Sequence, residues 1–403
     1  MLSADADADA DTADWGIVAL AVAAGMIAAA HVGKAPPALP LLRADLGLSL
    51  VGAGWVVSVF SVTGMVTGMA AGTIADRVGH FRLLAVGLGA LVAGGLAGAA
   101  ADTAPVLLAA RFLEGLGFVA VVVTAPSLIA AATGGRTRRL ALGMWGSYMP
   151  AGVALMMVVS PVALASHGWR GLWLALAALT VLWLVLLYAH RRRMPTPTGR
   201  GADATTLSAN IRLTVSRPAA WLLAFCFTLY TVQWISVMVW LPSFLVEQRG
   251  AGTGEAAALT ALVVALNVPG NLAAGWLLHR GAPRWLLLAV ATTTMGVAAV
   301  GIFAEGLPDA LRYGLCLVFS GAGGLLPTAV LAAAPVAAPT PAQVGTTNGL
   351  LVQGSNLGQV IGPPLVAAVV AATGDWRGAL VVLVGAAAVG TLLSLAVRAT
   401  ERR

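Results

Sequence analysis

Long apolar runs follow one another along almost the whole of this chain. Each has about 18 residues or more, the length that a helix needs to cross the hydrocarbon core of a bilayer. Only 10% of the 403 residues are charged, against about 25% in soluble proteins, so we expect no soluble domain. The runs predict twelve membrane-spanning helices, at 15–40, 50–74, 83–101, 105–131, 140–166, 170–190, 218–245, 256–279, 284–305, 308–333, 344–371 and 378–397.

Two motifs recur at nearly the same offset in the two halves of the chain. HGWRG at 167–171 returns as GDWRG at 374–378, 207 residues later, and GTIADRVGHFR at 72–82 is answered by GWLLHRGAPR at 275–284, 203 residues later. Parallel repeats of membrane helices are a transporter design, because a site between two similar bundles can open to either side. We therefore expect an all-α membrane protein whose twelve transmembrane helices form two six-helix bundles related by internal duplication.

The expected bundles span 15–190 and 218–397, and 191–217 joins them as a cytoplasmic linker. Residues 1–14 are acidic and alanine-rich, which is typical of disorder, and 398–403 form a tail. Sixteen of the 23 Lys and Arg residues lie in alternate loops and tails, and five lie on the opposite side. The positive-inside rule then places both termini and the linker in the cytoplasm, with the protein in the inner membrane. Since the basic residues are scattered without interleaved aromatics, we expect no nucleic-acid partner.

The loop after the second predicted helix carries a specific pattern. The motif at 72–82 has glycines at its first and eighth positions, with an Asp-Arg pair between them. It resembles the signature cytoplasmic loop of the major facilitator superfamily, although His80 and Phe81 stand where that loop is usually basic. RFLEGLG at 111–117 resembles a second element of the same family. The resemblance implies secondary transport by alternating access, with conformational gating by Gly72, Asp76, Arg77, Gly79 and Arg82. The alternative is a solvated turn whose basic residues only set the topology.

Two shorter segments bear on the substrate. WLPSFL at 240–245 resembles a segment of the branch of that family associated with cyanate and similar small anions. Drug antiporters often carry Gly-Pro-x-x-Gly-Gly in the fifth span, where this chain has GSYMPAG at 146–152. The comparison favours a small anion over a drug as the substrate.

Ionisable residues inside a bilayer are costly to bury, so they usually face a cavity or a partner. Lys34 is the only lysine of the chain and follows His31 by three residues, so both lie on one helical face. Lys34 is a candidate for contact with a small anion, or it extends to the outer interface because Pro36 ends the span early. Arg111 and Glu114 are also three apart and predict an ion pair, with structural support and proton coupling as alternative roles of Glu114. Lys34 and Arg111 against Glu114 leave a net charge of +1, which favours an anionic substrate.

Neutral polar residues gather in the C-terminal half. Asn267 and Asn271 are four apart, and the amides of 344–371 fall within an arc of about 140° on a helix. A single buried amide can simply join helices, but together these residues indicate a polar cavity. Glycines 354, 358 and 362 are four apart and predict close helix packing. The candidate substrate-binding residues are Lys34, His31, Arg111, Tyr148, Tyr230, Gln233, Asn267, Asn271, Asn356 and Gln359.

The sequence has no nucleotide-binding loop, no metalloprotease motif and no nucleophile elbow, and its five histidines are scattered. We therefore expect no cofactor, no metal and no enzymatic activity. The expected function is secondary active transport of a small anionic solute by a monomer in the lipid bilayer, with protons as the coupling ion. Two alternatives stay open: proton-driven efflux of drugs or metabolites, and a membrane enzyme or sensor that uses His31 and Lys34.

Overall fold

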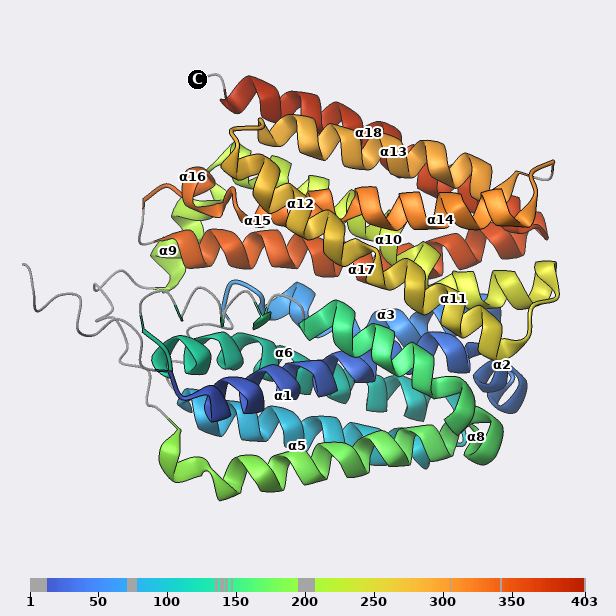
Figure 1. Ribbon diagram of the computed structural model, residues 1–403, viewed down its shortest axis with the longest axis horizontal. Helices are drawn as coiled ribbons and strands as arrows, with labels where there is room; N and C mark the ends of the chain where they lie inside the picture. Colours follow the sequence, from blue (N-terminus) through green and yellow to red (C-terminus); the bar gives the residue numbers. More distant parts are fainter. Residues whose placement is uncertain are drawn as a thin grey trace, which may run out of the picture.

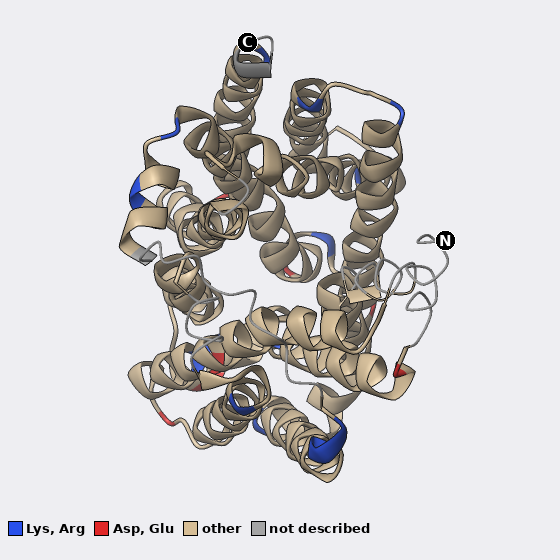
Figure 2. Ribbon diagram, turned by 90° about the vertical axis from the view of Figure 1, so that its left-hand side faces the viewer, with Lys and Arg blue, Asp and Glu red and all other residues tan. Residues whose placement is uncertain are grey.

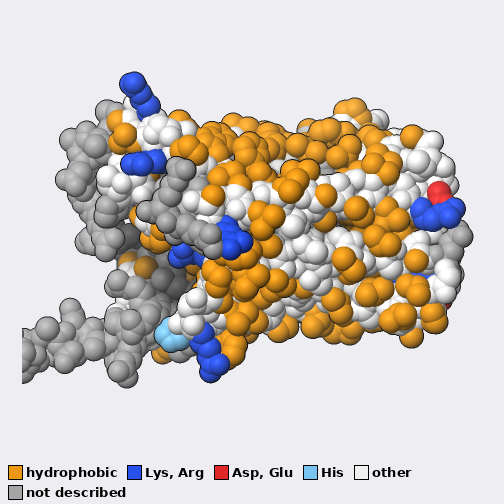
Figure 3. Space-filling view, turned by 90° about the horizontal axis from the view of Figure 1, so that it is seen from above, with side chains coloured by type: hydrophobic (Ala, Val, Ile, Leu, Met, Phe, Trp, Pro, Cys, Tyr) orange, Lys and Arg blue, Asp and Glu red, His pale blue; other side chains and the backbone are white. Residues whose placement is uncertain are grey.

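The computed structural model describes residues 13–70, 78–134, 148–194, 207–304, 306–340 and 343–401, with residues 137, 141, 144 and 145 between them. The regular elements of these ranges are helices, and a single bridge joins Ala13 to Thr133. Within these ranges, eleven helical segments are long and apolar enough to cross a membrane, so the chain is a multi-pass membrane protein. Hydrophobic side chains cover most of the middle of the face seen in Figure 3.

The N-terminal helices lie together as one group in the lower part of Figure 1. The first span is made of two helices, because Lys34 caps both and two prolines open the second. The helices of this group are α1 (Trp15–Gly33), α2 (Ala35–Leu46), α3 (Leu50–Thr67), α5 (His80–Ala99), α6 (Ala104–Ala131) and α8 (Tyr148–Ala189).

One difference from the twelve predicted spans lies in α8, which runs through the predicted spans 140–166 and 170–190. It has 42 residues, about 63 Å of helix and roughly twice the thickness of a bilayer core. Its backbone is not helical at Gly168, where φ is +64° and ψ is −174°. The eleven segments therefore include one that consists of two helices joined at a kink.

The C-terminal helices form a second group, in the upper part of Figure 1. Two of its spans are broken near mid-length, where Pro269 and Pro327 lie just after the breaks and cannot donate a backbone hydrogen bond. The elements that precede and form this group are η1 (Arg191–Arg193), α9 (Leu207–Val215), α10 (Pro218–Arg249), α11 (Thr253–Ala265), α12 (Asn267–His279), α13 (Arg284–Phe303), α14 (Asp309–Gly323), α15 (Leu325–Leu331), α16 (Ala334–Ala337), α17 (Val344–Thr373), η3 (Trp376–Gly378) and α18 (Ala379–Glu401).

The two ends of the molecule differ. Helix α1 begins and α18 ends at the same end, which faces the viewer in Figure 2. We call the opposite end the distal end; α2, α10 and α17 finish there, each with a left-handed glycine. Only glycine adopts that conformation without strain, so Gly47, Gly250 and Gly374 set these sharp turns.

The groups meet along α3 and α17. Ser58 Oγ donates to the Gln359 carbonyl at 2.9 Å, and Gln353 Nε2 donates to the Met65 carbonyl at 2.8 Å. A Cβ atom on Gly54 would come within 3.0 Å of Pro364. The two helices therefore lie side by side over most of the length of α3.

Glycines of α17 allow α10 to approach closely, which confirms the packing predicted from their spacing. A Cβ atom at Gly354 would lie 2.4 Å from the Ala224 carbonyl oxygen, and one at Gly358 would lie 2.3 Å from that of Thr228. These contacts are with backbone, which cannot rotate away. The contact between α10 and α17 therefore leaves no room for a side chain at Gly354 or Gly358.

We expect Gly358→Ala to lower the free energy of unfolding by about 1–3 kcal/mol, because the added methyl group overpacks this contact. Gly345→Ala, in the first turn of the same helix, is the matched control, since nothing lies within 4 Å of its Cβ position. Thermal unfolding in detergent measures both. Equal melting temperatures for the two variants would contradict the close packing of α10 and α17.

Candidate functional site

A cavity of about 620 Å³ lies between the two groups of helices. The N-terminal group lines it with apolar side chains, such as Val57, Met149 and Met157. The C-terminal group adds aromatic and polar side chains from α10, α12, α15 and α17. Among the described residues that line this cavity, none carries a charge. The volume suits a small organic solute, and its walls suit a solute with an apolar body.

Most polar groups of the cavity are already paired with one another. Asn267 Nδ2 donates to the Tyr230 hydroxyl at 3.1 Å and to the Ser320 carbonyl at 3.0 Å. Asn271 Nδ2 donates to Asn267 Oδ1 at 2.8 Å, and Asn271 Oδ1 accepts from Thr328 Oγ1 at 2.9 Å. The two asparagines therefore fasten α12 to α10, α14 and α15, at the places where two spans are broken.

Two donors are left for a solute. Gln359 Oε1 accepts from Ser61 Oγ at 3.1 Å, and within the described part of the chain its Nε2 has no protein acceptor. The Tyr230 oxygen accepts from Asn267, so its own hydrogen remains available to donate. The cavity therefore offers hydrogen-bond donors to a solute that carries acceptors.

The ionisable residues expected in the membrane form a separate cluster. Glu114 Oε1 lies 2.5 Å from Lys34 Nζ and 3.1 Å from His31 Nδ1, while its Oε2 lies 2.5 Å from Arg111 Nη1. His31 Nε2 is 3.1 Å from Thr180 Oγ1. The side chains of Glu114, Lys34, His31 and Arg111 are fully buried. The i, i+3 spacing of His31 with Lys34 and of Arg111 with Glu114 turns each pair toward the same point.

The cluster lies directly behind the wall of the cavity. Val32 and Gly33, which stand between His31 and Lys34 in the sequence, line the cavity, whereas His31 and Lys34 do not. Lys34 Nζ lies 4.4 Å from the centre of the Trp173 ring, so its charge is held inside the N-terminal group. With two cations and one carboxylate, the cluster keeps the net charge of +1 that the sequence predicts.

The predicted substrate-binding residues fall into three sets. Tyr230, Asn267, Asn271 and Gln359 line the cavity. His31, Lys34 and Arg111 belong to the buried cluster, so Lys34 neither reaches the solute cavity nor extends to an interface. The remaining three lie outside the lining: Gln233 is buried against the Leu229 carbonyl, Asn356 donates to the Val352 carbonyl, and Tyr148 stacks on Trp145.

Sequence reasoning did not single out Ser355 and Thr328, which also line the cavity. Ser355 lies four residues before Gln359, on the same helical face, and Thr328 follows the proline that breaks the span of α14 and α15. The sequence alone contains both features. A four-residue spacing from a polar residue of the cavity and a position beside a helix break can each indicate a residue of the cavity wall.

The predicted gating loop is only partly described. Gly72, Asp76 and Arg77 lie outside the described residues. Gly79 has φ of +90°, which explains why a glycine stands immediately before α5. Arg82 lies exposed in the first turn of that helix.

The membrane helices and the cavity between the two groups are those of a multi-pass transport protein. The family model for the Major Facilitator Superfamily matches residues 17–342, and the chain belongs to this family. This agrees with the resemblance seen in the loop motif, and it indicates a transporter and not an enzyme.

Named relatives are also transport proteins. The chain is 26% identical over 341 residues to a Bacillus subtilis protein named for niacin/nicotinamide transport, covering 81% of each chain. It is 26% identical over 388 residues to a Cupriavidus necator protein named for sulfoacetate transport, covering 89% of this chain and 87% of the relative. Among solved structures, an inward-facing bacterial homolog of the human lysosomal transporter Spinster matches with a TM-score of 0.78 at 15% identity, covering 94% and 95% of the two chains.

Proposed function

We propose that this protein is a secondary active transporter of a small organic anion with an apolar body. The proposal rests mainly on two hydrogen-bond donors of the cavity that have no protein acceptor among the described residues. Gln359 Nε2 and the Tyr230 hydroxyl are available to an acceptor, and the described lining contains no carboxylate that would repel a negative charge. A carboxylate or sulfonate fits these donors, and the aromatic and methionine side chains fit the rest of the solute.

The buried cluster supports the choice of an anion. Its net charge of +1 lies behind Val32 and Gly33, on side chains that are fully buried and therefore weakly screened. A fixed positive charge beside an uncharged cavity raises the electrostatic potential there and attracts anions. Lys34 and Arg111 then favour the substrate through space, without touching it.

The names of the relatives agree with this class of substrate. Four relatives that align over two thirds or more of this chain are named for niacin/nicotinamide, sulfoacetate, gallate and hexuronate. All of these solutes except nicotinamide are organic anions at neutral pH. Drug efflux is the second candidate, since the N-terminal wall is apolar and a Mycobacterium tuberculosis multidrug resistance protein is 32% identical over 157 residues. That match covers only 38% of this chain, and the donor pair favours the anion.

The cavity is closed toward the distal end and extends toward the end that carries the termini. Arg43 and Glu247 join the two groups at the distal end, 3.1 Å apart. The lining reaches Trp276 near the end of α12 and Leu331 at the end of α15, which are both exposed. With the termini in the cytoplasm, this conformation opens inward, and transport requires the two groups to rock about the cavity.

Glu114 is the proposed site of proton coupling. It is the carboxylate of the buried cluster, and it contacts Lys34, Arg111 and His31 together. Protonation of Glu114 would release these partners and change the charge next to the cavity by one unit. Because α1, which carries His31, also lines the cavity, such a change reaches the substrate site directly.

Solute counterflow in proteoliposomes tests the function. Vesicles loaded with unlabelled gallate should accumulate labelled gallate, and an imposed pH gradient should drive accumulation without preloading. An unlabelled aromatic acid, its uncharged primary amide and a cationic drug serve as competitors. Competition by the acid alone supports the proposal, whereas competition by the drug alone would favour drug efflux as the function. Chemical conversion of the labelled solute would point to an enzyme.

A further inference from the structure

The tryptophans of the two recurring motifs make the same bond in both groups of helices. Trp169 Nε1 donates to Asp45 Oδ2 at 3.0 Å, and Trp376 Nε1 donates to Glu247 Oε2 at 3.3 Å. Asp45 lies near the end of the first span of its group, and Glu247 lies near the end of the first span of the other. Each bond therefore ties the end of a first span to the beginning of a last span, at the distal end.

The two carboxylates differ in their second partner. Asp45 also accepts from Arg170, the residue that follows its tryptophan, so this ion pair stays within the N-terminal group. In the C-terminal group the corresponding Arg377 pairs with Asp375 at 2.6 Å. Glu247 Oε1 instead lies 3.1 Å from Arg43 of α2, in the other group. Of these two carboxylates, Glu247 is the one whose ion pair crosses between the groups.

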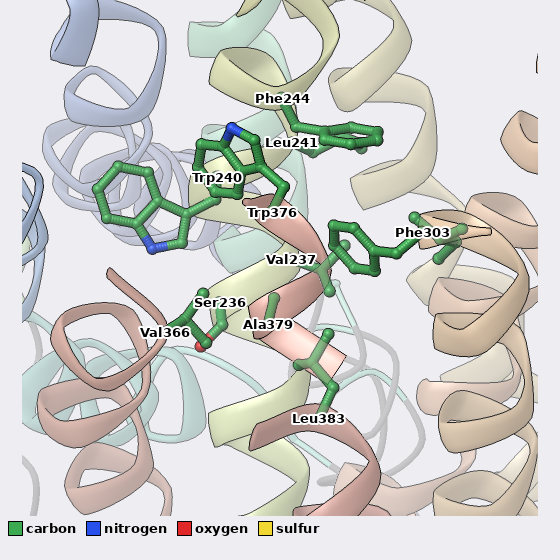
Figure 4. A pocket seen from close by; sticks show the side chains of 11 residues that line it. Ser236, Val237, Trp240, Leu241, Phe244, Phe303, Val366, Trp376, Ala379 and Leu383 are labelled. Atoms are coloured by element: carbon green, nitrogen blue, oxygen red, sulfur yellow. The ribbon is translucent and has the colours of Figure 1, made fainter. Parts of the chain in front are cut away.

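The tryptophan behind Glu247 is firmly held. Trp376 is 5% exposed, and its ring lies 5.8 Å from that of Trp240 and 6.3 Å from that of Phe244. Figure 4 shows these rings close together beside a small pocket within the C-terminal group. Trp240 in turn donates its indole hydrogen to the Pro363 carbonyl at 3.1 Å. One oxygen of Glu247 is therefore fixed by a buried partner, and the other is directed toward Arg43.

We propose that Glu247 is a positioning residue that keeps the distal end closed and lets it open in each transport cycle. Opening separates the two groups, so the bond between Arg43 and Glu247 breaks. The bond between Trp376 and Glu247 persists, because both residues belong to one group. Asp45 and Trp169 form the equivalent bond without this role, since both partners of Asp45 move together.

The exposure of the pair fits a contact that must break repeatedly. The side chains of Arg43 and Glu247 are 32% and 42% exposed, so water can replace either partner when the groups separate. Exposed ion pairs shift an equilibrium by about two- to fivefold. A bias of this size holds the distal end closed without trapping the protein in one conformation.

Distance measurements between spin labels at the distal end test this proposal without any substrate. Ala44 of α2 and Ala310 of α14 are exposed and belong to different groups, so cysteines there can carry the labels, with both native cysteines replaced by alanine. The variants are Glu247→Gln, Arg43→Gln and the double variant. The Glu247→Gln substitution removes the ion pair and keeps the indole bond, because an amide oxygen can still accept from Trp376. Asp45→Asn is the matched control.

We expect each single variant to raise the population ratio of long to short distances by about two- to fivefold, and the double variant to add nothing further. Asp45→Asn should leave the ratio unchanged, although it removes an ion pair at the same end. Arg43→Gln leaves Glu247 and Trp376 intact, so it tests the idea even if Glu247→Gln folds poorly. Additive effects, no effect, or an equal shift in Asp45→Asn would overturn the proposal.

Discussion

Replacing Glu114 by glutamine is expected to destabilise the protein by about 3–5 kcal/mol, because it leaves buried cations without their counterion. Glu114 contacts Lys34 and Arg111 at 2.5 Å each, and all three side chains are fully buried. The net charge of the cluster would rise from +1 to +2 with no access to water. Thermal unfolding of the purified protein measures the loss, which should be several times larger than that of any exposed substitution.

A charge-matched variant separates the destabilisation caused by the unbalanced charge from that caused by altered packing at residue 114. Lys34→Met combined with Glu114→Gln returns the cluster to +1, and we expect it to recover at least half of the lost stability. Folded protein of either variant should still exchange substrate, but a pH gradient should no longer drive accumulation, since the titrating group is gone. A Glu114→Gln protein with normal stability and normal pH-driven accumulation would exclude both the structural and the coupling role.

Much of the architecture was predictable, because the bilayer imposes long apolar helices with few charges. The loop motif at 72–82 and the apolar runs led to the correct family. The i, i+3 spacing also predicted that Arg111 and Glu114 would pair. What the spacing did not show was that Lys34 and His31 would join the same carboxylate from another helix.

The composition of the cavity was harder to predict, since side-chain direction depends on packing between helices. Lys34 has the chemistry of an anion-binding residue, yet its ammonium group pairs with a carboxylate on α6 and does not line the cavity. Asn267 and Asn271 share one helical face as expected, but they are largely occupied with each other and with Tyr230 and Thr328. A polar residue inside a span therefore indicates a polar environment. Which of its hydrogen-bond donors and acceptors stay unpaired can be determined only once the neighbouring side chains are placed.

Gln359→Glu is expected to reverse the preference of the cavity for acids over amides. The new side chain has nearly the same shape, and its Oε1 can still accept from Ser61, so the contact between α17 and α3 is preserved. Its second oxygen replaces the donor Nε2 in the cavity and adds a negative charge there. The loss of a hydrogen bond to a charged group costs about 1.5–3 kcal/mol, which corresponds to a roughly tenfold to hundredfold weaker affinity for an aromatic carboxylate. Repulsion between the two like charges weakens the affinity further.

Titration calorimetry at pH 8 with an aromatic carboxylate and its primary amide measures both affinities in one protein. The native cavity should favour the acid, whereas Gln359→Glu should favour the amide, because the amide can donate to the new carboxylate. Asn356→Asp is the matched control: it places the same charge on α17 at a residue outside the cavity lining, and should weaken acid binding far less. If Gln359→Glu leaves the acid-to-amide ratio unchanged while Asn356→Asp behaves like the native protein, the solute does not use the Gln359 donor, and the anionic end must be recognised elsewhere in the cavity.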